Sequence, residues 1–190
     1  MSVWVSRGGD KLSAAFQAWK SVLPRLEGAV AADFGSNVGG FVQCLLAQGI
    51  TRVYAIDTGY GVLAWELRND PRVCVMERTN ALHVVLPEKV DLVTIDVAWT
   101  KQRLILPAAF RLLRDSGLVV TLVKPQYEAA QKERRGGVLP GERVPDVLMR
   151  VRAEVRSVGG EILAELESPI KGAGGNTEFL WLVRPGNATF

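Results

Sequence analysis

The stretch Val30-Ala31-Ala32-Asp33-Phe34-Gly35-Ser36-Asn37-Val38-Gly39-Gly40-Phe41 decides the fold. Its first five residues are an apolar run typical of a buried β-strand, and the glycines that follow lead into a helical pattern from Phe41. Further apolar runs lie at 53–57, 73–76, 91–96 and 118–123, and helical patterns at 62–68 and 101–114 separate some of them. Alternation at this spacing predicts βαβ units and a parallel sheet.

The last third of the chain adds two strands, at 161–166 and 178–183, joined by a link too short for a crossover helix. Such strands form a hairpin, so one of them must run antiparallel to the rest of the sheet. A helix near 143–157 precedes them, and the polar, basic segment 126–146 is the best candidate for a mobile loop. The pattern predicts an α/β fold: a seven-stranded, mostly parallel sheet with one antiparallel strand and helices on both faces. This is the Rossmann-like layout of class I S-adenosylmethionine (SAM)-dependent methyltransferases.

Length and composition limit the remaining possibilities. The chain has 190 residues, 48% of them hydrophobic and 23% charged, which suits one domain with a buried core and excludes intrinsic disorder. We expect a single domain over 1–190, with an N-terminal segment and helix over 1–28 and a Rossmann-like core over 29–190. No apolar run approaches the roughly 20 residues of a membrane span, and no signal-peptide layout opens the chain. We therefore expect a cytoplasmic protein with no membrane partner.

Metal and disulfide chemistry are disfavoured by the residue counts. The chain has two cysteines, Cys44 and Cys74, and one histidine, His83. This is too few for a disulfide framework or a zinc site, so no metal is expected.

The positive charge is concentrated in one part of the chain. The net charge is +3, but residues 101–160 alone hold 12 Lys and Arg against 6 Asp and Glu. This asymmetry indicates a polyanionic partner, and a solvated basic helix face is the alternative.

The glycine loop and an acid on the next strand indicate a nucleoside ligand. Glycines at 35, 39 and 40 let the backbone approach a ligand closely, and the helix that follows offers free N–H groups. Asp57 closes the second strand, where an acid accepts hydrogen bonds from a ribose diol. The G-x-x-x-G-G spacing differs from the G-x-G-x-x-G of dinucleotide folds, so an adenosyl ligand is favoured over NAD.

Two polar residues end later strands of the predicted sheet. Asp96 ends the fourth strand and Lys124 the fifth, at the edge where open α/β sheets bind ligands. A lysine that closes an apolar strand is partly desolvated, which favours its uncharged form and makes Lys124 a candidate general base. The alternative is a lysine whose ammonium group extends from the strand end into solvent.

A series of motifs in fixed order gives a more specific indication. They are Ser6-Arg7-Gly8-Gly9-Asp10-Lys11-Leu12, Asp33-Phe34-Gly35 with Gly39-Gly40-Phe41, Leu92-Val93-Thr94-Ile95-Asp96-Val97, Leu122-Val123-Lys124-Pro125-Gln126-Tyr127-Glu128 and Gly175-Asn176-Thr177-Glu178-Phe179-Leu180. Together they resemble the hemolysin A (TlyA) family within the FtsJ-like ribose 2′-O-methyltransferases. The resemblance runs from about Val5 to Val183, nearly the whole chain.

The resemblance implies an activity and four catalytic residues. It implies transfer of a methyl group from SAM to a ribose 2′-OH of RNA, most simply ribosomal RNA or a ribosomal subunit, with S-adenosylhomocysteine as product. The family's Lys-Asp-Lys-Glu tetrad maps onto Lys11, Asp96, Lys124 and Glu178, all present in this chain. In the implied mechanism Lys124 takes or polarises the 2′-OH proton, assisted by Lys11. Asp96 holds Lys124 beside the methyl donor, and Glu178 completes the hydrogen-bond frame.

The resemblance also implies binding residues. Those for SAM are Asp33, Gly35, Ser36, Asn37, Gly39, Gly40, Phe41, Asp57, Thr58, Thr79, Asn80, Ala81 and Asp96, with the glycine loop at the methionine end, Asp57 at the ribose and 79–81 at the adenine. Cationic side chains suited to an RNA surface are Arg7, Lys132, Arg134, Arg135 and Arg143. Trp4 and Trp99 are candidates to stack on a base, with core packing as the alternative. Trp65 and Trp181 are expected in the core.

The chain departs from the family pattern in three places. Asn37-Val38 replaces the usual residues of the glycine loop, and Ala98-Trp99-Thr100-Lys101-Gln102 replaces a different run after Asp96, which leaves the nucleotide preference open. Family members usually carry an N-terminal S4 RNA-binding domain, whereas this chain starts where the methyltransferase domain begins. A separate RNA-recognition protein is therefore a possible partner.

Three other functions compete with this interpretation. The first is a non-catalytic SAM- or RNA-binding ribosome assembly factor that retains the fold, against which an intact tetrad argues. The second is a methyltransferase for a small molecule, disfavoured by the basic segment. The third is a pore-forming hemolysin, disfavoured because no insertion segment is visible.

Overall fold

Seven strands form one sheet in the order β3-β2-β1-β4-β5-β7-β6 in the computed structural model, which describes residues 4–186. The strands are β1 (Val30–Phe34), β2 (Arg52–Ile56), β3 (Val73–Met76), β4 (Val90–Ile95), β5 (Leu113–Val123), β6 (Gly160–Glu167) and β7 (Phe179–Pro185). β1 to β5 pair in parallel, whereas β7 pairs antiparallel with both β5 and β6. The predicted α/β fold, with seven strands and one antiparallel strand, is confirmed. The ends of the predicted domain, 1–3 and 187–190, lie outside the described residues.

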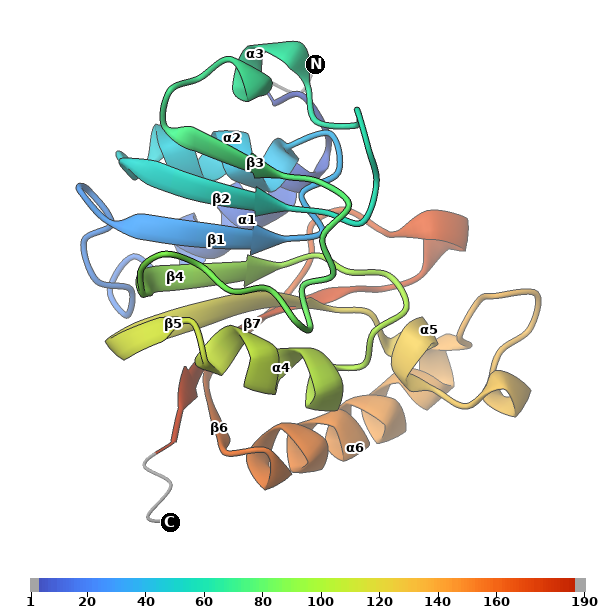
Figure 1. Ribbon diagram of the computed structural model, residues 1–190. Helices are drawn as coiled ribbons and strands as arrows, with labels where there is room; N and C mark the ends of the chain where they lie inside the picture. Colours follow the sequence, from blue (N-terminus) through green and yellow to red (C-terminus); the bar gives the residue numbers. More distant parts are fainter. Residues whose placement is uncertain (1–3, 187–190) are drawn as a thin grey trace.

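Helices cover both faces of this sheet (Figure 1). They are α1 (Gly8–Ala18), α2 (Gly40–Ala47), α3 (Trp65–Arg68), α4 (Gln102–Phe110), α5 (Pro125–Glu128) and α6 (Val144–Ser157), with 3-10 turns η1 (Gln131–Glu133), η2 (Gly141–Arg143) and η3 (Ala173–Gly175). α1 and α2 lie on one face and α4 and α6 on the other. No helix within residues 4–186 combines the length and apolarity that a bilayer crossing requires.

Alternation along the strands produces two cores, one on each side of the sheet. On β7, Leu180 and Leu182 pack with α1 and α2, while Trp181 and Val183 pack with α4 and α6. All four side chains are fully buried. Strands buried on both faces read as continuous apolar runs, which is why the sequence pattern located them.

The boundary between α4 and β5 differs from the prediction. The sequence pattern extends the helix to residue 114 and starts the strand at 118, whereas α4 ends at Phe110 and β5 begins at Leu113. Leu113 pairs with Val90 across an irregularity in the ladder, and Arg114 forms an ion pair with Asp91 at 2.7 Å. These contacts hold the segment extended despite its polar, exposed residues.

The segment 126–146 contains more regular structure than a loop prediction implies. It holds most of α5, η1, η2 and a β-bridge between Arg135 and Val138. Asn176, which is buried, accepts a hydrogen bond from the backbone N–H of Leu139 at 3.0 Å and so attaches this segment to the β6–β7 connection.

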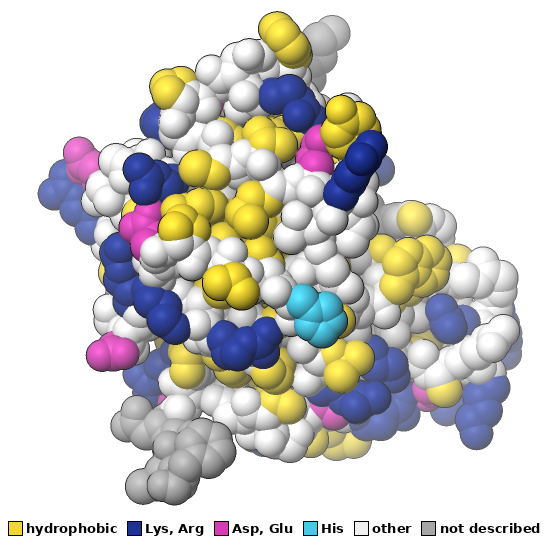
Figure 2. Space-filling view, in the orientation of Figure 1, with side chains coloured by type: hydrophobic (Ala, Val, Ile, Leu, Met, Phe, Trp, Pro, Cys, Tyr) yellow, Lys and Arg dark blue, Asp and Glu magenta, His cyan; other side chains and the backbone are white. Residues whose placement is uncertain are grey.

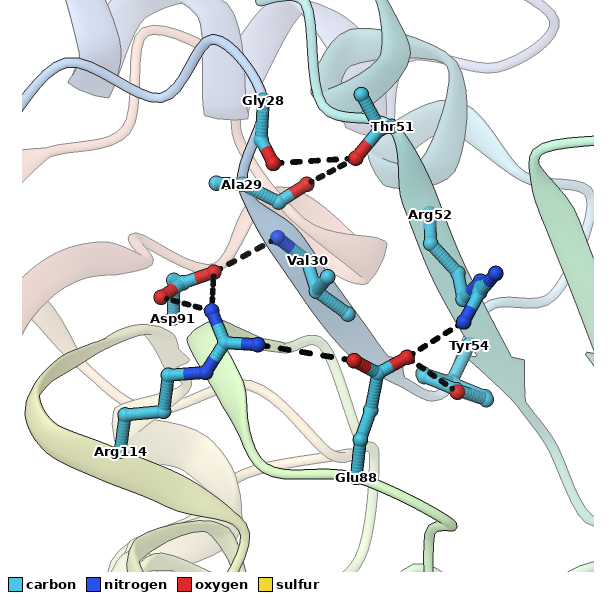
Figure 3. Close-up of polar contacts among 9 residues, drawn as sticks. All are labelled: Gly28, Ala29, Val30, Thr51, Arg52, Tyr54, Glu88, Asp91 and Arg114. Atoms are coloured by element: carbon cyan, nitrogen blue, oxygen red, sulfur yellow. Dashed lines mark hydrogen bonds and ion pairs between the residues drawn. The ribbon is translucent and has the colours of Figure 1, made fainter.

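A polar network closes the amino-terminal edge of the sheet (Figure 3). Glu88, in the loop before β4, accepts hydrogen bonds from Arg52 at 2.6 Å and from the Tyr54 hydroxyl at 3.0 Å. Arg114 lies 3.6 Å from Glu88 and 2.7 Å from Asp91. The network joins β2, β4 and β5, so its role is structural, and the opposite, carboxyl edge is left for ligands.

Candidate active site

Two cavities open side by side at the carboxyl edge of the sheet. The Asp57 cavity, about 630 Å³, lies between the residues that follow β1, β2, β3 and β4. The Lys11 cavity, about 380 Å³, lies between α1, the glycine loop, the start of α5 and the residues before β7. Four residues line both cavities: Gly35, Asn37, Asp96 and Lys124. A group bound in one cavity therefore lies next to a group bound in the other, with these four residues at the boundary.

Lys124 and Asp96 form an ion pair at this boundary. Asp96 follows the last residue of β4, and Lys124 follows β5 and precedes α5. Because β4 and β5 are parallel neighbours, their ends place the two side chains together, with Lys124 Nζ 2.6 Å from Asp96 Oδ1. Their side chains are 13% and 25% exposed. The lysine is thus fixed in orientation yet accessible from a cavity.

A second ion pair lies across the Lys11 cavity. Lys11, on α1, donates to Glu178 Oε2 at 2.6 Å although 167 residues separate them in sequence. Glu178 is 3% exposed and also accepts a hydrogen bond from the Gln126 amide at 3.4 Å. Gly172 allows this arrangement, because a Cβ at that position would lie 2.1 Å from Glu178 Oε1. The structure thus places Lys11, Asp96, Lys124 and Glu178 around one cavity.

The glycine loop is held by the acid after β2. Asp57 accepts hydrogen bonds from the backbone N–H groups of Asn37 at 2.8 Å and Gly59 at 2.7 Å. Gly35 has φ +81°, and a Cβ there would lie 2.6 Å from the carbonyl oxygen of Asp96. Only glycine therefore lets the loop pass so closely beneath the end of β4.

The lining of the Asp57 cavity fits an adenosyl group. Part of the lining is apolar and comes from β2, α4 and the loops beside them; these side chains are Ile56, Val62, Ala81, Leu82, Val97 and Ile105. Asp57 supplies carboxylate oxygens at one end, and Thr58, Thr79 and Asn80 supply further polar groups. An apolar surface with an acid at its edge suits a purine and a ribose diol.

Some residues predicted for SAM lie elsewhere. Ser36, Gly40 and Phe41 line the Lys11 cavity rather than the Asp57 cavity. Gly39 lines neither cavity and faces α3, where a Cβ would lie 2.3 Å from Leu67 Cδ1.

Asp33 also lies outside both linings, fully buried in β1. One carboxyl oxygen accepts a hydrogen bond from the Thr94 hydroxyl at 2.6 Å, while Oδ2 is buried and has no hydrogen-bond partner among residues 4–186. Burial raises the pKa of Asp33 to about 7, and the nearby charges of Asp96 and Asp57 act in the same direction. Asp33 thus joins β1 to β4 through Thr94 and is not exposed in either cavity.

The predicted RNA-binding cations lie in three places. Arg7 lines the Lys11 cavity, and Lys132 and Arg143 line a separate groove beyond α5. Arg134 and Arg135 lie between η1 and the β-bridge to Val138, outside the linings of all these hollows.

Sequence reasoning missed several residues of the site. Gln126, Tyr127 and Lys171 all line the Lys11 cavity. The strand end at Lys124 was the available signal for the first two, since residues just beyond it must lie at the same edge. Trp99 is 80% exposed at the mouth of the Asp57 cavity, with its ring centroid 5.0 Å from that of Tyr127, so core packing is wrong for this tryptophan.

The sheet order, the glycine loop and the acid after β2 define a class I methyltransferase fold. Sequence comparison is more specific: this chain belongs to the FtsJ-like methyltransferase family, whose profile matches residues 4–184. It is 40% identical to the 16S/23S rRNA (cytidine-2′-O)-methyltransferase TlyA of Mycobacterium tuberculosis, over 94% of this chain and 68% of that protein. It is 35% identical to Hemolysin A of Brachyspira hyodysenteriae, over 93% of this chain and 75% of that protein.

A solved structure agrees with these relatives. A protein described as a candidate hemolysin from Streptococcus thermophilus superposes with a TM-score of 0.92 at 34% identity, covering 98% of this chain and 69% of its own. The resemblance to the hemolysin A (TlyA) group is therefore confirmed.

Proposed function

We propose that this chain transfers the methyl group of SAM to a ribose 2′-OH of ribosomal RNA, leaving S-adenosylhomocysteine. The observation that carries the proposal is the Lys124–Asp96 pair, 2.6 Å apart in the wall between a cavity that fits an adenosyl group and a second cavity beside it. The M. tuberculosis relative, which is named as an rRNA (cytidine-2′-O)-methyltransferase, supports this choice of acceptor.

In this proposal Lys124 handles the acceptor proton. Lys124 lines both cavities. Once its ammonium group has released a proton to solvent, the free amine can accept the proton of a 2′-OH as that oxygen becomes the nucleophile. Asp96 fixes the lysine by the ion pair at 2.6 Å. Holding the acceptor hydroxyl beside the donor supplies much of the acceleration, because the two reactants then need not find each other from solution.

The Lys11–Glu178 pair frames the acceptor side. Lys11 brings a second cation into the same cavity, and Glu178, held by Lys11 and Gln126, is an acceptor that can orient a ribose hydroxyl. Lys11 lies on α1, and Asp96 and Lys124 lie at the ends of β4 and β5. Glu178 directly precedes β7. Each is therefore positioned by a regular element.

SAM would be held in the Asp57 cavity, and when bound it supplies an activated methyl group on a sulfonium. Asp57 would accept hydrogen bonds from the ribose diol, and residues 79–81 would border the adenine. Gly35 and Asn37 line both cavities, so the loop from Gly35 to Phe41 would hold the methionine end where the two cavities meet. Gly40 and Phe41 open α2, and the N–H groups in the first turn of a helix suit a carboxylate.

The RNA would approach over Trp99 and the basic side chains. The exposed Trp99, packed against Tyr127, offers an aromatic face on which a base can stack while its ribose enters the Lys11 cavity. Cations on either side would contact phosphates: Arg7, Lys132, Arg134, Arg135 and Arg143.

Methyl transfer from tritiated SAM tests the proposal directly. The acceptors are bare ribosomal RNA, each ribosomal subunit and whole ribosomes, with Lys124→Ala as the control. We expect alkali-resistant 2′-O-methylated dinucleotides from one acceptor with the wild-type chain and none with the variant. Absence of label on every acceptor while SAM still binds would instead support a non-catalytic binding factor.

A further inference from the structure

A third hollow lies beside the active site, and the proposed reaction does not use it. It has a volume of about 610 Å³ and is bounded by the residue before α4, the end of α5, η1, η2 and α6. Its polar lining includes Lys101, Glu128, Lys132, Glu133, Arg143 and Arg150, and we call it the basic groove. Figure 2 shows Lys and Arg side chains gathered over this part of the surface.

Two of the acidic side chains in the groove already have partners within the protein. Glu133 is bound by Arg150 at 2.8 Å and by the backbone N–H of Ala130 at 2.8 Å. Glu128 is buried and accepts a hydrogen bond from the first backbone N–H of α4, that of Gln102, at 2.9 Å. Burial raises the pKa of Glu128 to about 7, so a large part of it is uncharged at neutral pH.

Three cations in the groove are left for a ligand. Lys101 Nζ donates to the carbonyl oxygen of Glu128 at 3.1 Å and forms no ion pair in the described chain. The side chains of Lys132 and Arg143 make no hydrogen bond or ion pair to any residue of 4–186. Glu154 is the remaining carboxylate of the lining. A concave surface with this excess of unpaired cations attracts an anion with several acceptor oxygens.

The position of the groove indicates which anion it binds. Lys101 follows Trp99 by two residues, and Glu128 follows Lys124 by four, so the groove continues from the aromatic rim of the active site. We propose that the basic groove binds a phosphodiester of the substrate RNA, next to the nucleotide that is methylated. This inference rests on the proposed function, and it assigns Lys101, Lys132 and Arg143 to one phosphate subsite rather than to a diffuse basic surface.

Two double variants test the subsite. Lys132→Ala with Arg143→Ala removes one lysine and one arginine from the groove; Lys20→Ala with Arg25→Ala removes the same two residue types from outside it. Affinity for ribosomal RNA is measured by fluorescence anisotropy over a series of KCl concentrations. We expect the groove variant to bind about tenfold more weakly and its salt slope to fall by about 1 for each lost contact. The control should lose less than about threefold.

The outcomes separate this inference from the proposed function. Equal losses in both double variants, or an unchanged salt slope in the groove variant, would overturn the subsite. SAM affinity, measured by calorimetry, should be the same in all three proteins, which confirms that the variants are folded. If the wild-type chain methylates no ribosomal acceptor, the proposed function fails. If it methylates one and the groove variant binds RNA normally, the subsite alone fails.

Discussion

Asp57 and Asn37 are joined by a hydrogen bond, 2.8 Å from the backbone N–H of Asn37 to Asp57 Oδ2, which attaches the glycine loop after β1 to the end of β2. The other carboxyl oxygen of Asp57 accepts the N–H of Gly59 at 2.7 Å. The acid assigned to the ribose thus also shapes the loop assigned to the methionine end. One substitution should therefore disturb both halves of the SAM site.

We predict that Asp57→Ala weakens SAM binding by about tenfold or more, because a charged hydrogen-bond acceptor is lost together with the loop's anchor. Isothermal titration calorimetry measures the effect. Asp70→Ala is the control, since Asp70 binds Arg72 outside both cavities. SAM affinity that is the same in the two variants would contradict the role of Asp57.

Substitution of Lys124 should remove catalysis and leave SAM binding nearly unchanged. Lys124→Arg keeps the positive charge, but a guanidinium cannot accept a proton at neutral pH. We expect methyl transfer to fall by about 10² to 10⁴ in this variant. Lys171→Ala serves as a control, because Lys171 lines the same cavity yet binds Glu167 and Thr177. Substantial activity in Lys124→Arg would show that proton removal does not depend on this residue.

A pair of glycine substitutions tests the geometry around Glu178. At Gly172 an added Cβ would meet Glu178 Oε1 at 2.1 Å, whereas at Gly141 it would meet no atom within 4 Å. Neither glycine has a positive φ, so backbone strain does not enter the comparison. Gly172→Ala should displace Glu178 from Lys11 and reduce kcat about tenfold or more; Gly141→Ala should leave it unchanged. Equal rates would mean that the Lys11–Glu178 pair is dispensable.

The sequence was sufficient for the sheet because its strands are buried on both faces. β1, β4 and β7 are recognised as apolar runs without any tertiary information. The start of β5 was not predictable, because Arg114 lies in the strand only through its ion pair with Asp91. That contact depends on the neighbouring strand, which a local pattern does not record.

In the site, too, the residue types were predictable from the sequence, whereas their contacts depend on tertiary packing. Residue types and order indicated Lys11 and Glu178, but their 2.6 Å contact depends on where α1 packs. For two tryptophans, the sequence pattern did not show that the side chain is exposed. Trp65 was expected in the core and is 75% exposed, and Trp99 is 80% exposed. An aromatic residue in an apolar setting gives no local signal of which way it faces.

The exposure of Trp99 leads to a prediction about the acceptor. Trp99→Ala should raise KM for RNA about tenfold, the value of one base–aromatic stack, with little change in SAM affinity. Trp99→Phe should restore most of the loss, since a phenyl ring still stacks. Trp65→Ala removes an equally exposed tryptophan outside both cavities and should have no effect. A KM that rises equally in both alanine variants would refute a specific contact.

Asp33 predicts a pH dependence of stability. Its pKa is about 7 in the folded chain, against 3.8 ordinarily, so the folded state binds an extra proton between these values. The contribution of Asp33 to stability should therefore be greatest at about pH 4 and below, and it should fall as the pH rises toward 7, by at most about 4 kcal/mol. Asp33→Asn keeps an acceptor for the Thr94 hydroxyl and carries no charge. The stability of this variant should therefore fall less steeply with pH than that of wild type.

Urea unfolding of both proteins measures the difference in their free energies of unfolding. The measurements are made at about pH 5, 6, 7 and 8, which span the titration of Asp33. We expect the free energy of unfolding of Asp33→Asn, relative to wild type, to increase from about pH 5 to about pH 7 and to level off at about pH 8, above the pKa of Asp33. Glu128, whose pKa is also raised to about 7 by burial, adds a slope of the same sign in both proteins. Glu128→Gln in the Asp33→Asn background should reduce that slope further. A relative stability of Asp33→Asn that does not change with pH would show that Asp33 does not titrate in this range, because any steric cost of the amide is independent of pH.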